Sequence, residues 1–217
     1  MGGRGAGSGG NTGGSGSGGV NPNDIVKTES LLSYAGKTQE INEVMEAVKN
    51  VYEDYGLNGA LTDIQVATLK GSGMLTMAYY DNEGNLAVNK AYFDAKAMNQ
   101  AWDASVEKKF HPPRGNKSGL EATASHELGH RLTEEVGRKM GLGDWQLDQA
   151  SNTIMKNARK NGKFKNVESM KKAISGYAEK NNAEAVAEAF ADVYCNGKKA
   201  SKASQAVVKE LNSYFNK

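Results

Sequence analysis

The spacing of apolar residues predicts a helix followed by a small sheet in the first half of the chain. In residues 38–55 apolar side chains recur at three- and four-residue intervals, which predicts an amphipathic helix that ends at Gly56. The apolar run in residues 60–70 predicts a strand. Residues 74–93 place Asp-Asn-Glu-Gly between two further apolar stretches, which predicts a β-hairpin with Gly84 at the position that requires a positive φ.

Helices separated by glycine, proline and basic loops are predicted for the rest of the chain. After the loop around Pro112 and Pro113, a long helix is expected from Ser118 or Gly119 to about Met140. Other helices are expected over residues 94–110, 144–160, 167–177, 182–194 and 201–215, with Asp144 and Asn182 as N-caps. This order predicts an α+β fold in which a small, mostly antiparallel sheet packs its hairpin on the long helix.

Composition separates a tail from one domain. Glycine and serine dominate residues 1–23, which cannot bury apolar surface and are expected to form a flexible arm ahead of a domain at 24–217. Such an arm suits a tether to a partner, or is a remnant of expression. The single cysteine, Cys195, excludes an internal disulfide framework and is expected to be a half-buried spacer.

Charge and hydropathy narrow the classes of partner. The net charge of +2 favours no strongly charged partner, and the basic residues between 156 and 172 are expected to form a solvated face, so nucleic acid is not an expected partner. No apolar run approaches the roughly 18 residues that a membrane span needs. The N-terminus lacks the apolar segment of a secretory signal. The protein is therefore expected in the cytoplasm, or to be delivered without a classical signal peptide.

The most informative motif is His126-Glu127-Leu128-Gly129-His130, which has the form H-E-x-x-H. On a helix, two histidines four residues apart lie one turn above each other on one face and can bind one Zn²⁺ at about 2.0–2.1 Å per nitrogen. Glu127 points toward the same opening and can take a proton from water activated by the metal. The alternative interpretation is an amphipathic helix that carries two polar histidines.

A catalytic zinc site needs a third protein ligand. The extended H-E-x-x-H-x-x-G-x-x-H pattern is excluded, because Thr133 and Val136 occupy its last two defined positions. An ordered set of carboxylates is available from Glu184, Glu188 and Asp192, which fall at i, i+4 and i+8 on one helical face. This pattern also suits a solvated acidic face, but the Ala, Val and Phe residues between them favour a buried metal site.

Together these motifs resemble the gluzincin metallopeptidases of the anthrax lethal factor type, a pattern that also occurs among phage and mobile-element proteins. The resemblance covers about residues 110–195, where the second motif has the form Y-x-x-x-N-x-x-E-x-x-A-E-x-F. The matching residues are Tyr177, Asn181, Glu184, Ala187, Glu188 and Phe190. The chain departs from the family at Val186, which replaces an aromatic residue.

The resemblance implies a zincin-like domain and a role for each matching residue. Glu184 would be the third zinc ligand, and Glu188 would orient a zinc-binding histidine through its other ring nitrogen. Tyr177 would donate to the substrate carbonyl, and Asn181 would brace the turn before the ligand helix. In the family the substrate lies along an edge strand, for which the predicted hairpin is the candidate; a purely structural hairpin is the alternative. His111 could line the cleft, or be an exposed or backbone-bonded loop residue.

The expected function is zinc-dependent endopeptidase activity on a protein or peptide substrate. A first alternative is a structural or virion-associated protein that keeps the metal site for stability. A second is an effector with one narrow protein target. The presence of Glu127 disfavours the structural alternative, because a closed structural zinc site has no use for a general base.

Overall fold

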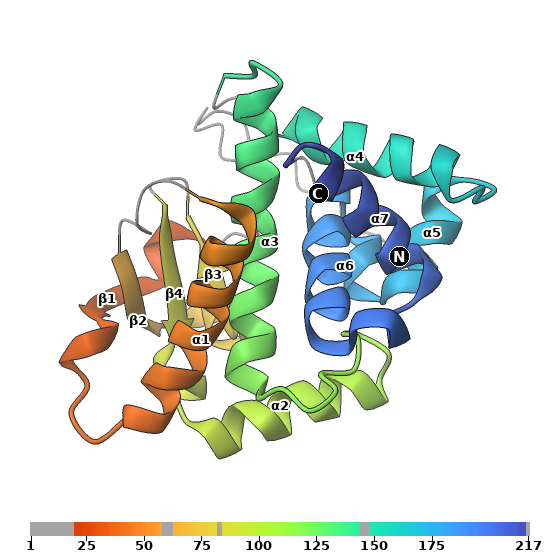
Figure 1. Ribbon diagram of the computed structural model, residues 1–217. Helices are drawn as coiled ribbons and strands as arrows, with labels where there is room; N and C mark the ends of the chain where they lie inside the picture. The colour runs from red at the N-terminus through yellow and green to blue at the C-terminus, as the bar shows by residue number, and fades with distance from the viewer. Residues whose placement is uncertain (1–19, 58–62, 82–83, 144–147, 216–217) are drawn as a thin grey trace, which may run out of the picture.

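The computed structural model describes residues 20–57, 63–81, 84–143 and 148–215. Within these ranges the chain is α+β, with seven α-helices and a four-stranded sheet (Figure 1). The strands are β1 (Ile25–Ser30), β2 (Asp63–Leu69), β3 (Ala78–Tyr80) and β4 (Asn85–Asn89). The helices are α1 (Thr38–Tyr55), α2 (Ala95–Glu107), α3 (Gly119–Lys139), α4 (Asp148–Asn161), α5 (Val167–Ile174), α6 (Asn182–Asn196) and α7 (Lys202–Ser213).

The sheet is mixed, with the strand order β1-β2-β4-β3. The predicted hairpin is present, since β3 and β4 pair antiparallel and Gly84 has φ 86°. The sheet was expected to be mostly antiparallel; its two outer pairings are antiparallel, but the central strands β2 and β4 pair in parallel. Strand β1, which pairs antiparallel with β2, was not predicted. That strand is largely exposed, so it lacks the apolar alternation that marks a half-buried strand.

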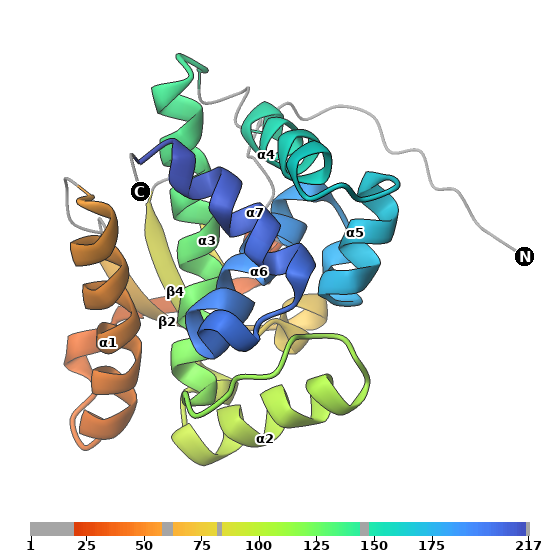
Figure 2. The same ribbon diagram turned by 45° about the vertical axis from the view of Figure 1, so that its right-hand side comes forward.

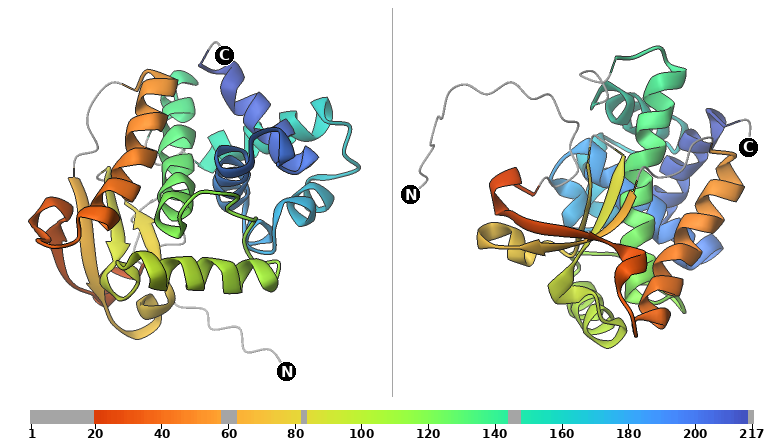
Figure 3. Two further views of the ribbon diagram at one scale, coloured as in Figure 1. Left: turned by 60° about the horizontal axis from the view of Figure 1, so that its bottom comes forward. Right: turned by 90° about the vertical axis from the view of Figure 1, so that its left-hand side faces the viewer.

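The long helix α3 occupies the centre of the domain (Figures 1 and 2). One face of the sheet, including Val66, Leu86 and Val88, belongs to the same buried cluster as Val44 of α1 and Leu128 of α3. The other side of α3 packs against α6, and α7 packs on α6 in turn. Seen from below, α2 crosses near the beginning of α3 (Figure 3). The helix that carries H-E-x-x-H is therefore held between the sheet and the C-terminal helices.

Local capping chemistry explains where most helices begin and end. The predicted helix at 38–55 is α1, which ends at Gly56 with φ 55°. Ser118 caps α3 in a capping box with Glu121. The N-cap of α6 is Asn181 rather than the predicted Asn182, since the Asn181 side chain accepts a hydrogen bond from the Glu184 amide at 2.8 Å. The predicted cap Asp144 lies outside the described residues.

Part of the predicted arm at 1–23 packs on the domain. Of that arm, residues 20–23 are described: Val20 packs against a small apolar cluster on the outer face of the sheet, and Pro22–Asp24 form a 3-10 turn. None of the helices in the described ranges has the length and apolar character of a membrane span.

Candidate metal centre

Helix α3 presents His126, Glu127 and His130 at its buried face. All three side chains lie on the middle of the helix, and each residue is 6% exposed. The two imidazole rings are neighbours, with centroids 5.1 Å apart, as the i, i+4 spacing requires. Both histidines therefore face the interior of the protein rather than solvent.

Helix α6 brings Glu184 to the two histidines because α3 and α6 cross at very short range. At the crossing, a Cβ added to Gly129 would lie 2.8 Å from the Cα of Ala187. Gly129 stands between the two histidines in the sequence, and Ala187 stands between Glu184 and Glu188. Two small residues thus let the helices approach closely enough for side chains on each side of the contact to meet.

The predicted acidic face of α6 is buried, not solvated. Glu184 and Glu188 are 0% exposed and Asp192 is 4% exposed. Asp192 takes no part in the site, because it accepts hydrogen bonds from the Asn196 side chain and the Ser201 amide, before α7. The three carboxylates of one helical face therefore divide into two that approach the histidines and one that joins α6 to α7.

His126, His130 and Glu184 form a group that could bind a metal ion. One ligand atom from each lies within 4.8 Å of the others. Glu184 Oε2 is 3.2 Å from His126 Nε2 and 3.3 Å from His130 Nε2. Ligand atoms about 2.0–2.1 Å from one ion at tetrahedral angles are about 3.3 Å apart, so these spacings fit a four-coordinate ion of the size of zinc.

Three buried polar atoms at this place are without a hydrogen bond of good geometry among the described residues. His126 Nδ1 faces Glu188 Oε1 at 2.8 Å, and the other two are His130 Nε2 and Glu127 Oε2. Buried polar atoms normally make hydrogen bonds, so unpaired ones indicate a place where a further group binds. An ion ligated by His130, with water beside Glu127, would satisfy these last two, and the residues present therefore fit a metal.

Glu188 lies behind His126, on the side away from Glu184. Its Oε1 lies 2.8 Å from His126 Nδ1, the ring nitrogen that faces away from Glu184. The same oxygen is 2.8 Å from His111 Nδ1, and Ser175 Oγ donates to Oε2 at 2.6 Å. A carboxylate held in this way fixes the ring orientation of His126 and leaves its Nε2 for a metal.

His111 lies in the cleft and is not an exposed loop residue. Its ring stacks on Trp102 at 4.6 Å, and Trp102 Nε1 donates to the carbonyl of Pro112. The loop is tied to the segment before α6, since the amides of Gly176 and Tyr177 donate to the carbonyls of Lys109 and Phe110 at 2.9 Å. These contacts place His111 and Tyr177 side by side, with ring centroids 5.3 Å apart.

Burial and the close carboxylates perturb the titration of these groups. Burial alone would lower the pKa of His126, but hydrogen bonds with Glu184 and Glu188 reverse this and hold its pKa well above 6.5. Burial alone would raise the pKa of Glu184, yet the two imidazoles hold it far below its usual value. Burial raises the pKa of Glu127, and the nearby histidines oppose the increase.

Metal binding is expected to expel a proton from His126. Because Glu184 and Glu188 raise the pKa of His126 in the metal-free protein, its ring keeps a proton to higher pH than a free imidazole, whereas ligation requires the neutral ring. The apparent affinity for zinc should therefore increase about tenfold per pH unit until that pKa is passed. Calorimetric titration in buffers of different ionisation enthalpy measures the proton released. An affinity independent of pH between 6 and 8, with no proton release, would contradict this prediction.

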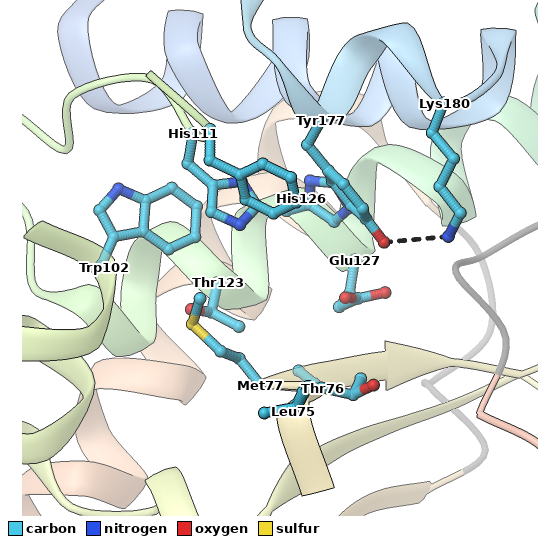
Figure 4. Close-up of a pocket in the computed structure, with 12 residues that line it drawn as sticks. Leu75, Thr76, Met77, Trp102, His111, Thr123, His126, Glu127, Tyr177 and Lys180 are labelled. Carbon is cyan, nitrogen blue, oxygen red and sulfur yellow. Dashed lines mark hydrogen bonds between the residues drawn. The ribbon is translucent and has the colours of Figure 1, made fainter. Parts of the chain in front are cut away.

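A cavity of about 410 Å³ opens at His126 and Glu127 of the motif (Figure 4). Its walls come from the segment that leads into β3, from α2, the loop before α3, α3 itself and the segment before α6. The lining residues are Leu75, Thr76, Met77, Ala78, Trp102, Phe110, His111, Thr123, His126, Glu127, Tyr177 and Lys180. Trp102 is buried and also forms one wall of the cavity.

One residue of the cavity wall, Lys180, was not predicted from the sequence. The Tyr177 hydroxyl donates to Glu184 Oε1 at 3.3 Å, and Lys180 Nζ lies 3.2 Å from that hydroxyl. The position of Lys180, three residues after Tyr177 and four before Glu184, was nevertheless a signal for contact on one helical face. By contrast, Cys195 is buried rather than half-buried, and burial raises the pKa of its thiol to about 12, so it offers no reactive thiolate.

Comparison with known proteins adds no relative: no protein-family model matches the chain, and neither does any curated protein or solved structure. The function is therefore argued from the site itself.

Proposed function

We propose that this protein is a zinc-dependent endopeptidase with a zincin-like fold, of the gluzincin type that its motifs resemble. The observation that carries the proposal is the convergence of His126 Nε2, His130 Nε2 and Glu184 Oε2 within bonding distance of one ion. Beside them stand an unpaired Glu127 oxygen and a cavity large enough for part of a peptide. A purely structural zinc site would be closed and would need neither.

Glu127 and Tyr177, which line the cavity, each have a task in the proposed peptide hydrolysis. When bound, zinc supplies a Lewis acid that makes water a nucleophile near neutral pH. Glu127 is the general base that takes a proton from this water and returns it to the leaving nitrogen. Burial keeps its carboxylate away from competing partners and raises its pKa toward the working range of a base. Tyr177 supplies a hydroxyl proton to the carbonyl oxygen on which negative charge develops.

The edge strand β3 is placed to bind an extended peptide. In its pairing with β4, the hydrogen bonds Asn89 N to Met77 O and Asp81 N to Asn85 O mark the residues that face β4. Because hydrogen bonding alternates along an antiparallel pair, the amide and carbonyl of Ala78 turn away from β4. Ala78 also lines the cavity, which favours pairing of its backbone with a substrate strand.

A digest of casein tests the proposal. The zinc-loaded protein should cleave casein, lose activity when a chelator removes the metal, and regain it when zinc is restored. Zinc binding without cleavage of casein or of a diverse peptide library would contradict a general endopeptidase. It would instead support the structural or narrow-target alternatives.

Removal of the Tyr177 hydroxyl is expected to slow turnover without loss of metal. Tyr177→Phe should lower kcat by about 10²–10³-fold, the loss typical of one oxyanion donor, because the ring and its packing on Phe110 remain. Steady-state kinetics together with metal analysis measure both effects. Wild-type kcat in this variant would remove Tyr177 from the catalytic group.

A further inference from the structure

Lys180 brings an ammonium group to the two residues beside the proposed metal position. It lies between the 3-10 turn Tyr177–Glu179 and Asn181, the N-cap of α6. Its Nζ is 3.2 Å from Tyr177 Oη and 3.3 Å from Glu184 Oε1. Figure 4 shows its contact with the Tyr177 hydroxyl at the wall of the cavity.

The two oxygens of Glu184 face different groups. Oε2 faces the Nε2 atoms of His126 and His130. Oε1 is 3.3 Å from both the Tyr177 hydroxyl and Lys180 Nζ. The tyrosine and the lysine thus serve the same carboxylate oxygen, on the side away from the histidines.

The numbers of available protons distinguish the two donors. A tyrosine hydroxyl has one proton to give and can accept a hydrogen bond, whereas an ammonium group has three protons and accepts none. The Tyr177 proton cannot serve Glu184 and a substrate at once. Lys180 can donate to Glu184 Oε1 and to Tyr177 Oη together, so it keeps the buried carboxylate satisfied when the tyrosine proton is needed elsewhere. Its donation to the phenolic oxygen also polarises the O–H bond.

We propose that Lys180 is a positioning residue that releases the Tyr177 hydroxyl from Glu184 for donation to the substrate. This inference rests on the proposed peptidase function and adds to it a residue at a position that the second motif leaves undefined. Without Lys180, the Tyr177 proton stays on Glu184 Oε1, because an unsatisfied buried carboxylate oxygen is costly.

The test uses the full chain with the variants Lys180→Met, Lys180→Arg, Tyr177→Phe and the double variant Lys180→Met/Tyr177→Phe. Lys172→Met, at an exposed lysine of α5 away from the cavity, is the matched control. Three quantities are measured: hydrolysis of a casein peptide that the wild type cleaves, zinc affinity by chelator competition, and affinity for a phosphinic peptide built on that cleavage site. The tetrahedral phosphorus of this probe imitates the carbon reached during hydrolysis, so it reports the Tyr177 donor at equilibrium.

Lys180→Met is expected to lower kcat and to weaken the phosphinic peptide by about tenfold, the value of one hydrogen bond to a charged group. KM and zinc affinity should stay close to those of the wild type, as should every property of Lys172→Met. In the Tyr177→Phe background the lysine substitution should have no further effect, because Lys180 acts through the hydroxyl. Lys180→Arg, which keeps charged donors, should restore part of the loss.

Two results would overturn the role of Lys180 while the peptidase stands. In the first, the wild type cleaves peptides and binds the phosphinic peptide, but Lys180→Met behaves like the wild type. The role is equally overturned if the lysine substitution causes the same loss in the wild type and in Tyr177→Phe. The second is a fall in zinc affinity that accounts for the fall in turnover, which would assign Lys180 to the support of Glu184. A wild type that binds zinc but neither cleaves peptides nor binds the probe would overturn the proposed function itself.

Discussion

Glu127→Gln is expected to lose about 10²–10⁴-fold in kcat while it keeps its zinc, because the amide cannot accept the proton that general-base catalysis requires. The side chain has no place among the three predicted ligands, and its Oε2 makes no hydrogen bond to the described residues. Glutamine has nearly the same shape, so the packing of α3 should be kept. The measurement is steady-state hydrolysis of casein peptides, with zinc analysis of the same sample.

Glu135→Gln is the matched control, since Glu135 lies on the same helix and pairs with Arg131 and Arg138 away from the cavity. It should retain wild-type kcat. Equal activity of Glu127→Gln and the wild type would refute the assignment of Glu127 as the base. Loss of zinc from Glu127→Gln would instead give this residue a role in binding the metal.

Glu184→Gln is expected to weaken zinc binding far more than Glu188→Gln. The two carboxylates are one turn apart on α6 and equally buried, so each substitution controls for the other. Glu184 Oε2 faces both histidine Nε2 atoms, whereas the histidine atoms that Glu188 contacts are Nδ1 of His126 and Nδ1 of His111. Loss of a residue that only orients a ligand costs about 10–100-fold in metal affinity, and loss of the ligand itself should exceed this.

Chelator competition on the two variants measures the difference directly. Thermal unfolding of the zinc-free proteins is the necessary companion, because Glu188 also accepts a hydrogen bond from Ser175 and its replacement can disturb the fold. The opposite order of zinc affinities would move the ligand one turn along α6.

The part of the site on α3 could be predicted because its residues lie close together in the sequence. The spacing of His126 and His130 implies a shared helical face, and the cap at Ser118 and the apolar pattern of α3 fix where that helix lies. The resemblance named Glu184 and Glu188, and in the structure both carboxylates lie beside the histidines. Sequence periodicity alone could not separate these residues from a solvated acidic face, because their burial depends on the contact between Gly129 and Ala187.

Other features depend on contacts that leave little trace in the sequence. The parallel pairing of β2 with β4 joins strands that are not neighbours in the chain, and the exposed strand β1 lacks an apolar pattern. Lys180 occupies a position that the motif leaves undefined. Its relevance appears only when the turn before α6 places its ammonium group beside Tyr177 and Glu184.

Diffraction from zinc-loaded crystals at the zinc absorption edge tests the central claim most directly. The account predicts one anomalous peak about 2.0–2.2 Å from His126 Nε2, His130 Nε2 and Glu184 Oε2, with a further position open toward the cavity that contains Glu127. A peak bound by other residues, or no peak near these three side chains at saturating zinc, would contradict it.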